Sequence, residues 1–344
     1  MSLDWFQLYR DRAVLDNRWK DGKQKPSSLK GHTDSIYCVQ FNGDQMLITG
    51  SRDRTIKLWD LGTGECTETL RGHQGSVLCL RVDGSRIISG SSDCRIIQWA
   101  PKTCEVSQKN ISYEVETEFI GHGSGVLDLA MNEKVIISCS KDMTIKVWDR
   151  LSNKLIRTIT GHHGPVNALQ LLAAQFPASS DASKGSSENN PTTTRFISAS
   201  GDSSMKLWEL ETGKCLRVFE GHLRGLACVK LVEELGLVIS GSKDENIKIW
   251  DLNTGRCMKT LIGHEGLVRT LDVDVAQKRL VTGSYDKTIK VWDLSEGSLI
   301  LDFRKQGNRF KSLVFDLKIN CNKIVSVGHD SSIVVVSNLN YPIS

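Results

Sequence analysis

Two short motifs recur along this chain at a nearly constant interval. Gly-His pairs begin at Gly31, Gly72, Gly121, Gly161, Gly221 and Gly263. A tryptophan follows within each unit, at Trp59, Trp99, Trp148, Trp208, Trp250 and Trp292, and the shortest steps between these tryptophans are 40 and 42 residues. A chain of 344 residues would ordinarily suggest about two domains. The fixed period overrides that expectation and predicts an array of similar structural units.

Each unit has the pattern of four short strands. In the first unit, Ile36–Phe41 and Thr55–Trp59 alternate between apolar and polar residues. Met46–Gly50 is an apolar run, and Cys66–Leu70 leads to the next Gly-His pair. An aspartate stands in the turn before the third strand of six units, at Asp53, Asp93, Asp142, Asp202, Asp244 and Asp286. A seventh, degenerate unit has Asp330 but neither a Gly-His pair nor a tryptophan.

Aspartate follows the tryptophan in four units, at Asp60, Asp149, Asp251 and Asp293. The period, the Gly-His pairs and these Trp-Asp dipeptides resemble those of the WD repeat. The resemblance implies an all-β, seven-bladed β-propeller over residues 24–344. In such propellers the histidine, the turn aspartate and the tryptophan typically share a buried hydrogen-bond network with a Ser or Thr, which satisfies polar groups inside each blade. We therefore expect the following residues to be structural, not catalytic or metal-binding: His32, Asp53, Trp59, His73, Asp93, Trp99, His122, Asp142, Trp148, His162, Asp202, Trp208, His222, Asp244, Trp250, His264, Asp286 and Trp292.

The ends of the chain are expected to meet in one blade. The seventh unit ends at Ile333–Ser337 and supplies only three strands. Pro26–Leu29, just before the first Gly-His pair, is available as the missing outer strand. Such a pairing would close the ring and remove the exposed sheet edges that it would otherwise have.

Composition narrows the class of protein. The net charge is only +4, which is too weak to indicate nucleic-acid binding. No run of about 18 apolar residues and no basic-then-apolar leader is present, so we expect a cytoplasmic or nuclear protein with no membrane contact. The ten cysteines include no C-x-x-C pair, and several recur at the same strand positions. We interpret them as reduced, buried hydrophobic residues and expect neither a metal nor a cofactor.

Two long insertions indicate which end of the propeller is free to bind a ligand. Residues 173–194, rich in Ser and Asn, separate the first two strands of the fourth unit and are predicted to form a disordered loop. Extra residues around Lys102–Glu118 separate the third and fourth strands of the second unit. Both insertion points lie at the same end of a four-stranded meander, the bottom face. The Gly-His loops and the aspartate turns form the opposite end, the top face, which is the better candidate for a binding site.

Two columns of residues are predicted to point from the top face toward the central axis. The first stands immediately before the turn aspartates, at Arg52, Ser92, Lys141, Gly201, Lys243, Tyr285 and His329. The second stands one residue into the first strand of each unit, at Tyr37, Leu78, Leu127, Asn167, Ala227, Arg269 and Lys311. The columns hold five cations (Arg52, Lys141, Lys243, Arg269 and Lys311) and no acid, and Arg224 and Arg309 flank the second column.

This bias favours an anionic ligand, and the arginines suit phosphate in particular. The alternative is that these cations only keep the surface soluble. The lysines two residues before each tryptophan are, in contrast, expected to lie on outward, solvated strand faces: Lys57, Lys146, Lys206, Lys248 and Lys290.

Before the propeller, residues 1–23 have the pattern of a short amphipathic helix. Trp5, Leu8 and Trp19 fall on one side of this helix, which would end near Gly22. The segment either caps the propeller or connects it to something upstream.

Several strings resemble the F-box/WD-repeat proteins, and most closely the beta-transducin-repeat-containing group. They are GSVLCL (75–80), SASGD (198–202), RGLAC (224–228), GHEGLVR (263–269) and SYD (284–286). The segment with Tyr9, Arg12 and Trp19 is similar to the linker that follows the F-box of these proteins. Members of the family are substrate receptors of Skp–cullin–F-box ubiquitin ligases, and their top face binds a doubly phosphorylated degron.

Carried over by position, the resemblance implies phosphate contacts from Arg52, Arg224, Arg269 and Tyr285. The remaining lining would come from Tyr37, Ser76, Ser92, Leu127, Asn167, Gly225, Ala227 and Arg309. The expected partners are phosphorylated protein substrates, with ubiquitin transfer carried out by other subunits.

Three departures limit what the resemblance implies. Ser203 stands where close relatives have an arginine, and Lys243 replaces a small polar residue, so the degron sequence cannot be carried over. No F-box-like segment precedes Leu3, so we expect contact with the Skp adaptor and cullin only if an F-box lies upstream. A ligase-independent scaffold is the alternative function. An enzyme finds no support, because the sequence has no nucleophile–base pair, metal cluster or phosphate-binding glycine loop.

Overall fold

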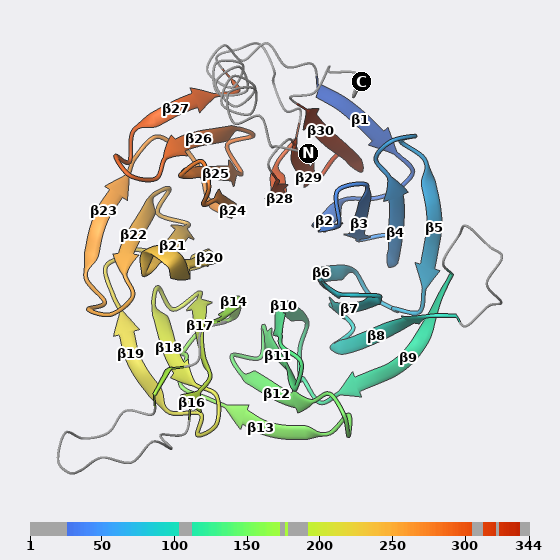
Figure 1. The fold of residues 1–344 in the computed structure, drawn as a ribbon, viewed down its shortest axis with the longest axis horizontal. Coiled ribbons are helices and arrows are strands. Elements are labelled where there is room, and N and C mark those ends of the chain that lie inside the picture. The colour runs from blue at the N-terminus through green and yellow to red at the C-terminus, as the bar shows by residue number, and fades with distance from the viewer. Residues whose placement is uncertain are drawn as a thin grey trace, which may run out of the picture.

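A computed structural model arranges the chain as a ring of seven four-stranded antiparallel sheets (Figure 1). The structure describes residues 26–102, 112–172, 176–177, 192–304, 312–320 and 323–337. The predicted seven-bladed all-β propeller is confirmed. The predicted helix within residues 1–23 lies outside the described residues. No helix among the described residues is long and apolar enough to cross a membrane.

Six blades follow chain order, with the first strand of each nearest the axis and the fourth at the rim (Figure 1). Blade 1 consists of β2 (Ile36–Asn42), β3 (Met46–Ser51), β4 (Thr55–Asp60) and β5 (Cys66–Arg71). Blade 2 consists of β6 (Val77–Asp83), β7 (Arg86–Ser91), β8 (Arg95–Pro101) and β9 (Tyr113–Ile120). Blade 3 consists of β10 (Val126–Met131), β11 (Val135–Ser140), β12 (Ile145–Asp149) and β13 (Leu155–Ile159). Blade 4 consists of β14 (Val166–Leu171), β17 (Arg195–Ser200), β18 (Met205–Glu209) and β19 (Cys215–Phe219). Blade 5 consists of β20 (Leu226–Val232), β21 (Leu237–Ser242), β22 (Ile247–Asp251) and β23 (Cys257–Leu261), and a 3₁₀ turn, Glu233–Leu235, follows β20. Blade 6 consists of β24 (Val268–Asp274), β25 (Arg279–Ser284), β26 (Ile289–Asp293) and β27 (Leu299–Asp302).

Blade 7 joins the two ends of the chain, as predicted. It consists of β28 (Val314–Ile319), β29 (Lys323–Gly328), β30 (Ser332–Ser337) and β1 (Pro26–Lys30). Strand β1 pairs antiparallel with β30 over five residues, from Pro26 opposite Val336 to Lys30 opposite Ser332. Backbone groups that a three-stranded blade would leave exposed at the seam are thereby paired.

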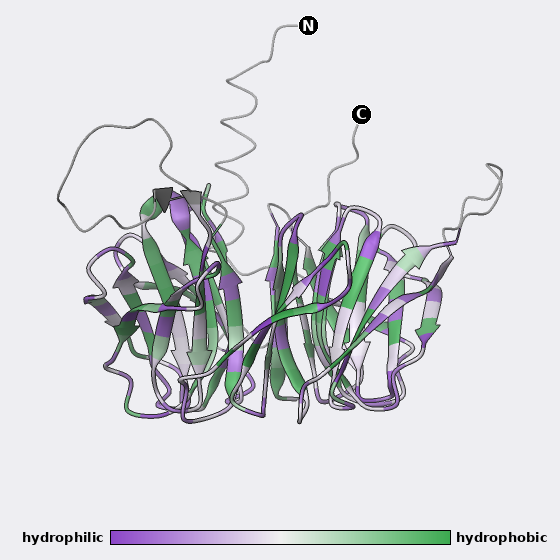
Figure 2. Cartoon of the chain, turned by 90° about the horizontal axis from the view of Figure 1, so that it is seen from below, coloured by the Kyte–Doolittle hydropathy of each residue, from purple (hydrophilic) through white to green (hydrophobic). Residues whose placement is uncertain are grey.

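The apolar core lies between neighbouring blades. Trp59 and Leu47 of blade 1, for example, pack in one buried cluster with Val325 and Ile333 of blade 7. Other clusters likewise combine residues of adjacent blades. Each sheet is therefore covered on both faces by its neighbours. Figure 2 shows the strands running from one face of the ring to the other, so that the loops gather at two opposite ends.

Strands occupy part of each insertion that was predicted from the sequence. Tyr113–Ile120 forms strand β9, which pairs with β8, so residues 113–118 belong to blade 2 and not to the insertion. In the other insertion, β15 (Phe176–Pro177) pairs with β16 (Thr192–Thr193). Residues 103–111 and 178–191 lie outside the described residues.

The prediction that the lysines before the tryptophans are solvated is wrong for two of them. Lys146 and Lys290 are buried. Lys146 donates a hydrogen bond from Nζ to Thr158 Oγ1 at 2.9 Å, and Lys290 forms a buried ion pair with Asp302. The fourth strand of the blade covers the lysine stem, which a pattern within the third strand alone cannot reveal.

Candidate functional site

Each of blades 1–6 contains the same buried hydrogen-bond chain. In blade 6, His264 Nδ1 lies 2.7 Å from Asp286 Oδ2, and His264 Nε2 lies 2.8 Å from Thr282 Oγ1. Trp292 Nε1 donates to the same Thr282 oxygen at 2.9 Å. The hydroxyl partners in blades 1–5 are Thr49, Ser89, Ser138, Ser198 and Ser240. The carboxylate holds the proton on Nδ1, so Nε2 accepts from the hydroxyl, and every member of the chain is satisfied.

The glycine of each Gly-His pair contacts the tryptophan of its own unit. A Cβ atom on Gly31 would lie 2.8 Å from the Trp59 ring, and one on Gly263 would lie 3.0 Å from the Trp292 ring. The glycine therefore leaves space for the indole, while the histidine beside it bonds the turn aspartate. Both residues of the motif are accounted for by the architecture of the blade.

The hydrogen-bond chains predict how stability depends on pH. Burial lowers the pKa of His122, His162 and His222, although the aspartate partners partly oppose this effect. Burial alone would raise the pKa of Asp142, but hydrogen bonds from Thr144 and His122 lower it to about 2. In both cases the unfolded chain binds protons more readily than the folded chain, so stability is present at neutral pH and is lost on acidification.

We expect the free energy of unfolding to be level above about pH 7, to fall below about pH 6.5 and to fall again below about pH 4. Urea unfolding at a series of pH values measures this. His163 is exposed, so His163→Gln should change the curve only slightly, through the loss of its charge beside His162. A stability that stays constant from pH 7.5 to 5 would contradict the prediction.

A β-bulge creates the second predicted column. In every blade the pairing of the first and second strands shifts register across one residue, and that residue's side chain lines the central channel. The bulge residues are Tyr37, Leu78, Leu127, Asn167, Ala227, Arg269 and Phe315. Bulges re-aim side chains and are common next to binding sites.

One member of this column was predicted incorrectly. The bulge of β28 lies between Val314 and Asp316, so Phe315 occupies the position assigned to Lys311. Lys311 and Arg309 themselves lie outside the described residues. The seventh unit has no Gly-His pair to anchor its register, which explains the error. The two columns thus contain four cations, Arg52, Lys141, Lys243 and Arg269, and still no acid.

The first predicted column is fixed by its backbone. The N–H of each of these residues donates to a carbonyl just before the first strand of the same blade, as Lys243 does to Gly225 at 2.9 Å. The seven donors are Arg52, Ser92, Lys141, Gly201, Lys243, Tyr285 and His329. Their side chains are therefore free to vary while the backbone position is retained. Ser76 joins this region through its N–H, which donates to Ser92 Oγ at 2.8 Å.

The cations differ in how they are held. Arg52 lies 3.7 Å from Asp34 in a weak, exposed ion pair. Arg224 and Lys243 are exposed and line a hollow of about 440 Å³ over blades 4 and 5, which Gly201 and Gly225 help to form by lacking side chains. Within the described part of the chain, neither Arg224 nor Lys243 forms an ion pair with a carboxylate, and the same holds for Lys141. Unpaired cations around a hollow are suited to an anionic ligand.

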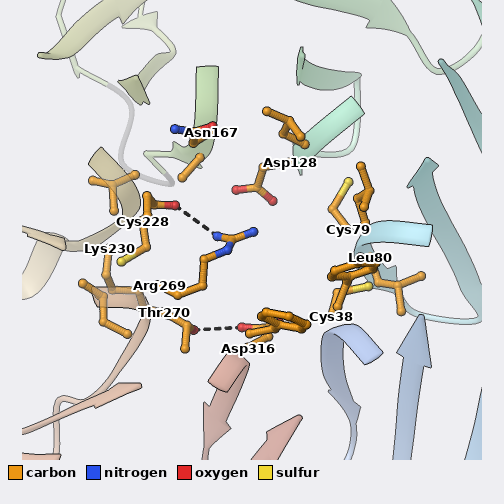
Figure 3. Close-up of a pocket in the computed structure, with 18 of the residues that line it drawn as sticks. Cys38, Cys79, Leu80, Asp128, Asn167, Cys228, Lys230, Arg269, Thr270 and Asp316 are labelled. Carbon is orange, nitrogen blue, oxygen red and sulfur yellow. Dashed lines mark hydrogen bonds between the residues drawn. The ribbon is translucent and has the colours of Figure 1, made fainter. Parts of the chain in front are cut away.

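Arg269 lies lower, in the mouth of the channel. Its side chain is half-buried, and Nη1 donates to the Ala227 carbonyl at 3.2 Å (Figure 3). Asn167 makes a similar bond, from Nδ2 to the Leu226 carbonyl at 2.6 Å. Ala227 and Arg269 both line this channel.

An aromatic cluster covers the opposite part of the top face. The rings of Tyr37 and Phe315 stack with centroids 5.2 Å apart. Tyr285 and His329 contact Phe315 edge-on, at 5.7 and 6.4 Å. The cluster combines blades 6, 7 and 1. The top face therefore carries an aromatic cluster over blades 6, 7 and 1 in addition to the cationic hollow over blades 4 and 5.

Partly buried charges line the channel below the bulges and compensate one another. Arg81 pairs with Asp128 at 2.8 Å, and Lys230 pairs with Asp272 at 2.7 Å. These charges were not predicted from the sequence. The strings VLDL (126–129), which contains Asp128, and VFDL (314–317), which contains Asp316, are a repeated signal for the carboxylates. No cluster of three or more metal-ligating side chains occurs among the described residues.

Comparison with protein families agrees with this architecture. The family described as "WD domain, G-beta repeat" matches residues 23–60, 64–100, 113–149, 153–209, 213–251 and 255–293, well over half of the chain. The chain belongs to the WD-repeat family. The six matched segments correspond to the six units with a tryptophan, and the structure adds the degenerate seventh blade of this WD-repeat protein.

Curated relatives of this WD-repeat chain include subunits of ubiquitin ligases. A protein of Talaromyces stipitatus called "Probable E3 ubiquitin ligase complex SCF subunit sconB" is 31% identical over 282 residues, covering 64% of this chain and 42% of the relative. A Neurospora crassa protein called "Probable E3 ubiquitin ligase complex SCF subunit scon-2" is 28% identical over 317 residues, covering 64% of this chain and 49% of the relative. The chain thus spans less than half of the length of these relatives.

A solved structure supports the fold. The WD40 β-propeller domain of Doa1 superposes with a TM-score of 0.72 at 24% identity, covering 92% of this chain and 97% of that domain.

Proposed function

We propose that this WD-repeat propeller is the substrate-recognition part of a Skp–cullin–F-box-type ubiquitin ligase and that its top face binds phosphorylated degron peptides. The observation that carries the proposal is the set of cations on that face, Arg52, Lys141, Arg224, Lys243 and Arg269, with no acid in either column. Substrates would be phosphorylated proteins in the cytoplasm or nucleus. The propeller would deliver them without taking part in catalysis.

Electrostatics supports an anionic ligand of this kind. Arg224 and Lys243 line one hollow, so a phosphate placed there would meet two cations at once. Charge-assisted hydrogen bonds to phosphate are about twice as strong as neutral ones. Lys141, Arg52 and Arg269 lie outside this hollow, in blades 3, 1 and 6, which suits a peptide with more than one negative charge.

The names of the relatives support the ligase assignment, and the strings that resemble the beta-transducin-repeat-containing group support it further. Contact with a Skp adaptor and a cullin would require an F-box in the full gene product. Lys243 and Ser203 differ from that group, so the preferred spacing of phosphates should differ as well.

Titration of the 344-residue chain with a library of singly and doubly phosphorylated peptides tests the proposal. We expect binding that requires phosphate, prefers two phosphates and weakens when salt rises from about 0.05 to 0.3 M, because the charges are solvent-accessible. Binding that is indifferent to phosphate or to salt would refute the degron assignment. It would favour a ligase-independent scaffold.

A further inference from the structure

The carboxylate of Asp316 joins three blades at one point. Asp316 directly follows the bulge residue Phe315 in β28. Its Oδ1 accepts a hydrogen bond from the Thr270 hydroxyl of blade 6 at 2.9 Å (Figure 3). Its Oδ2 accepts one from the backbone N–H of Val39 in blade 1 at 3.0 Å. One side chain of blade 7 therefore holds both neighbouring blades.

Nearby cations keep this carboxylate in a charged environment. Burial alone would lower the pKa of Lys318, but the carboxylates of Asp316 and Asp272 raise it above its ordinary value. The ammonium is therefore charged at neutral pH, as is the guanidinium of Arg81. The bonds from Thr270 and Val39 therefore end on a side chain that also lies near two cations.

The two groups of neighbouring blades that Asp316 bonds lie one and two residues from a bulge residue of the top face. Thr270 follows Arg269, and Val39 stands two residues after Tyr37. Tyr37 and Phe315 stack across the boundary between blades 1 and 7, which are separate sheets. Because no strand ladder joins β28 to β2, the relative position of the two rings depends on contacts between the blades.

We infer that Asp316 is a positioning residue for the top face, which holds Tyr37 against Phe315 and fixes Arg269 beside them before a ligand arrives. The inference rests on the proposed function for the ligand, whereas the positioning itself is a property of the free protein. Holding the side chains in place in advance reduces the entropy that binding would otherwise cost.

Asp128 provides a matched control within the same chain. It occupies the equivalent position of β10, accepts the backbone N–H of Leu169 in the next blade at 2.9 Å and pairs with Arg81. The bulge residues beside it, Leu127 and Asn167, form no aromatic stack. Removing either carboxylate breaks a bond between blades, but Asp316 directly follows a residue of the aromatic cluster and Asp128 does not.

Fluorine NMR of the full chain labelled with 3-fluorotyrosine tests the inference without a ligand. Tyr37→Phe assigns the Tyr37 resonance. We expect Asp316→Asn to shift or broaden that resonance, because an amide cannot accept at both oxygen positions, and to leave Tyr113 unchanged. Thr270→Val, which removes one donor with little change of volume, should produce a smaller effect and serves if the first variant folds poorly. A Tyr37 resonance unmoved in both variants, or moved equally by Asp128→Asn, would overturn the inference.

A double-mutant cycle then tests the consequence for binding. Asp316→Asn should weaken phosphopeptide binding roughly tenfold, and its effect should be strongly non-additive with Phe315→Leu, because the two residues act through one cluster. Additive losses would overturn the inference. If the wild-type chain binds no phosphopeptide, the proposed function fails, while the Tyr37 resonance still decides whether Asp316 positions the cluster.

Discussion

Arg224→Glu should weaken phosphopeptide binding by at least about 100-fold at low salt, since it removes a charge-assisted contact and places a like charge beside the ligand. The side chain is exposed and forms no ion pair within the described residues, so its replacement should not disturb folding. The loss should shrink as salt rises, because screening reduces both the attraction and the repulsion. Fluorescence anisotropy with a labelled doubly phosphorylated peptide measures the change.

Lys214→Glu is the matched control for that variant. Lys214 is exposed in the turn between β18 and β19, at the bottom face, and its reversal changes the net charge by the same amount. We expect binding to change by less than about threefold, through weak long-range electrostatics alone. Equal losses in the two variants would show that overall charge, and not the hollow lined by Arg224 and Lys243, governs binding.

Thr282→Val should lower the free energy of unfolding by about 2–6 kcal/mol. The two side chains have nearly the same shape, so no cavity is expected. The buried His264 Nε2 and Trp292 Nε1 would each lose their partner, and an unsatisfied buried group costs about 1–3 kcal/mol. This loss is a large fraction of the roughly 5–15 kcal/mol by which domains are ordinarily stable. Urea denaturation followed by tryptophan fluorescence measures it.

Thr282→Ser separates the hydroxyl from the methyl group. Serine serves at this position in blades 2–5, as Ser198 does in blade 4, so the hydrogen-bond chain should persist. We expect a cost of about 1 kcal/mol, for the buried methyl alone. If valine and serine destabilise the protein equally, the hydrogen-bond chains contribute little to stability.

The fold could be predicted from the sequence because one residue type performs one task in every unit. Gly31 makes room for an indole, His32 bonds Asp53, and these requirements recur at a fixed spacing. The prediction of the channel-lining residue was wrong in the seventh unit, which has no Gly-His pair from which to count, so Lys311 was assigned to the position that Phe315 occupies. Burial of Lys290 also escaped detection, since it depends on Asp302 in the neighbouring strand.

The candidate site was predictable to a similar extent. The columns before the turn aspartates and within the first strands follow from the repeat alone, whichever residues occupy them. The contacts between blades cannot be predicted from the repeat in this way. The bond from Val39 to Asp316 joins residues 277 positions apart in different sheets, and no local pattern encodes it.

Pairing of β1 with β30 has a mechanical consequence. Pro26 lies opposite Val336, so both outward-leading ends of the pair leave from the same side of the blade. A force that pulls the two chain ends apart would unzip this pair one hydrogen bond at a time, and would not load all five residue pairs together in shear. Blade 7 would therefore yield first under tension.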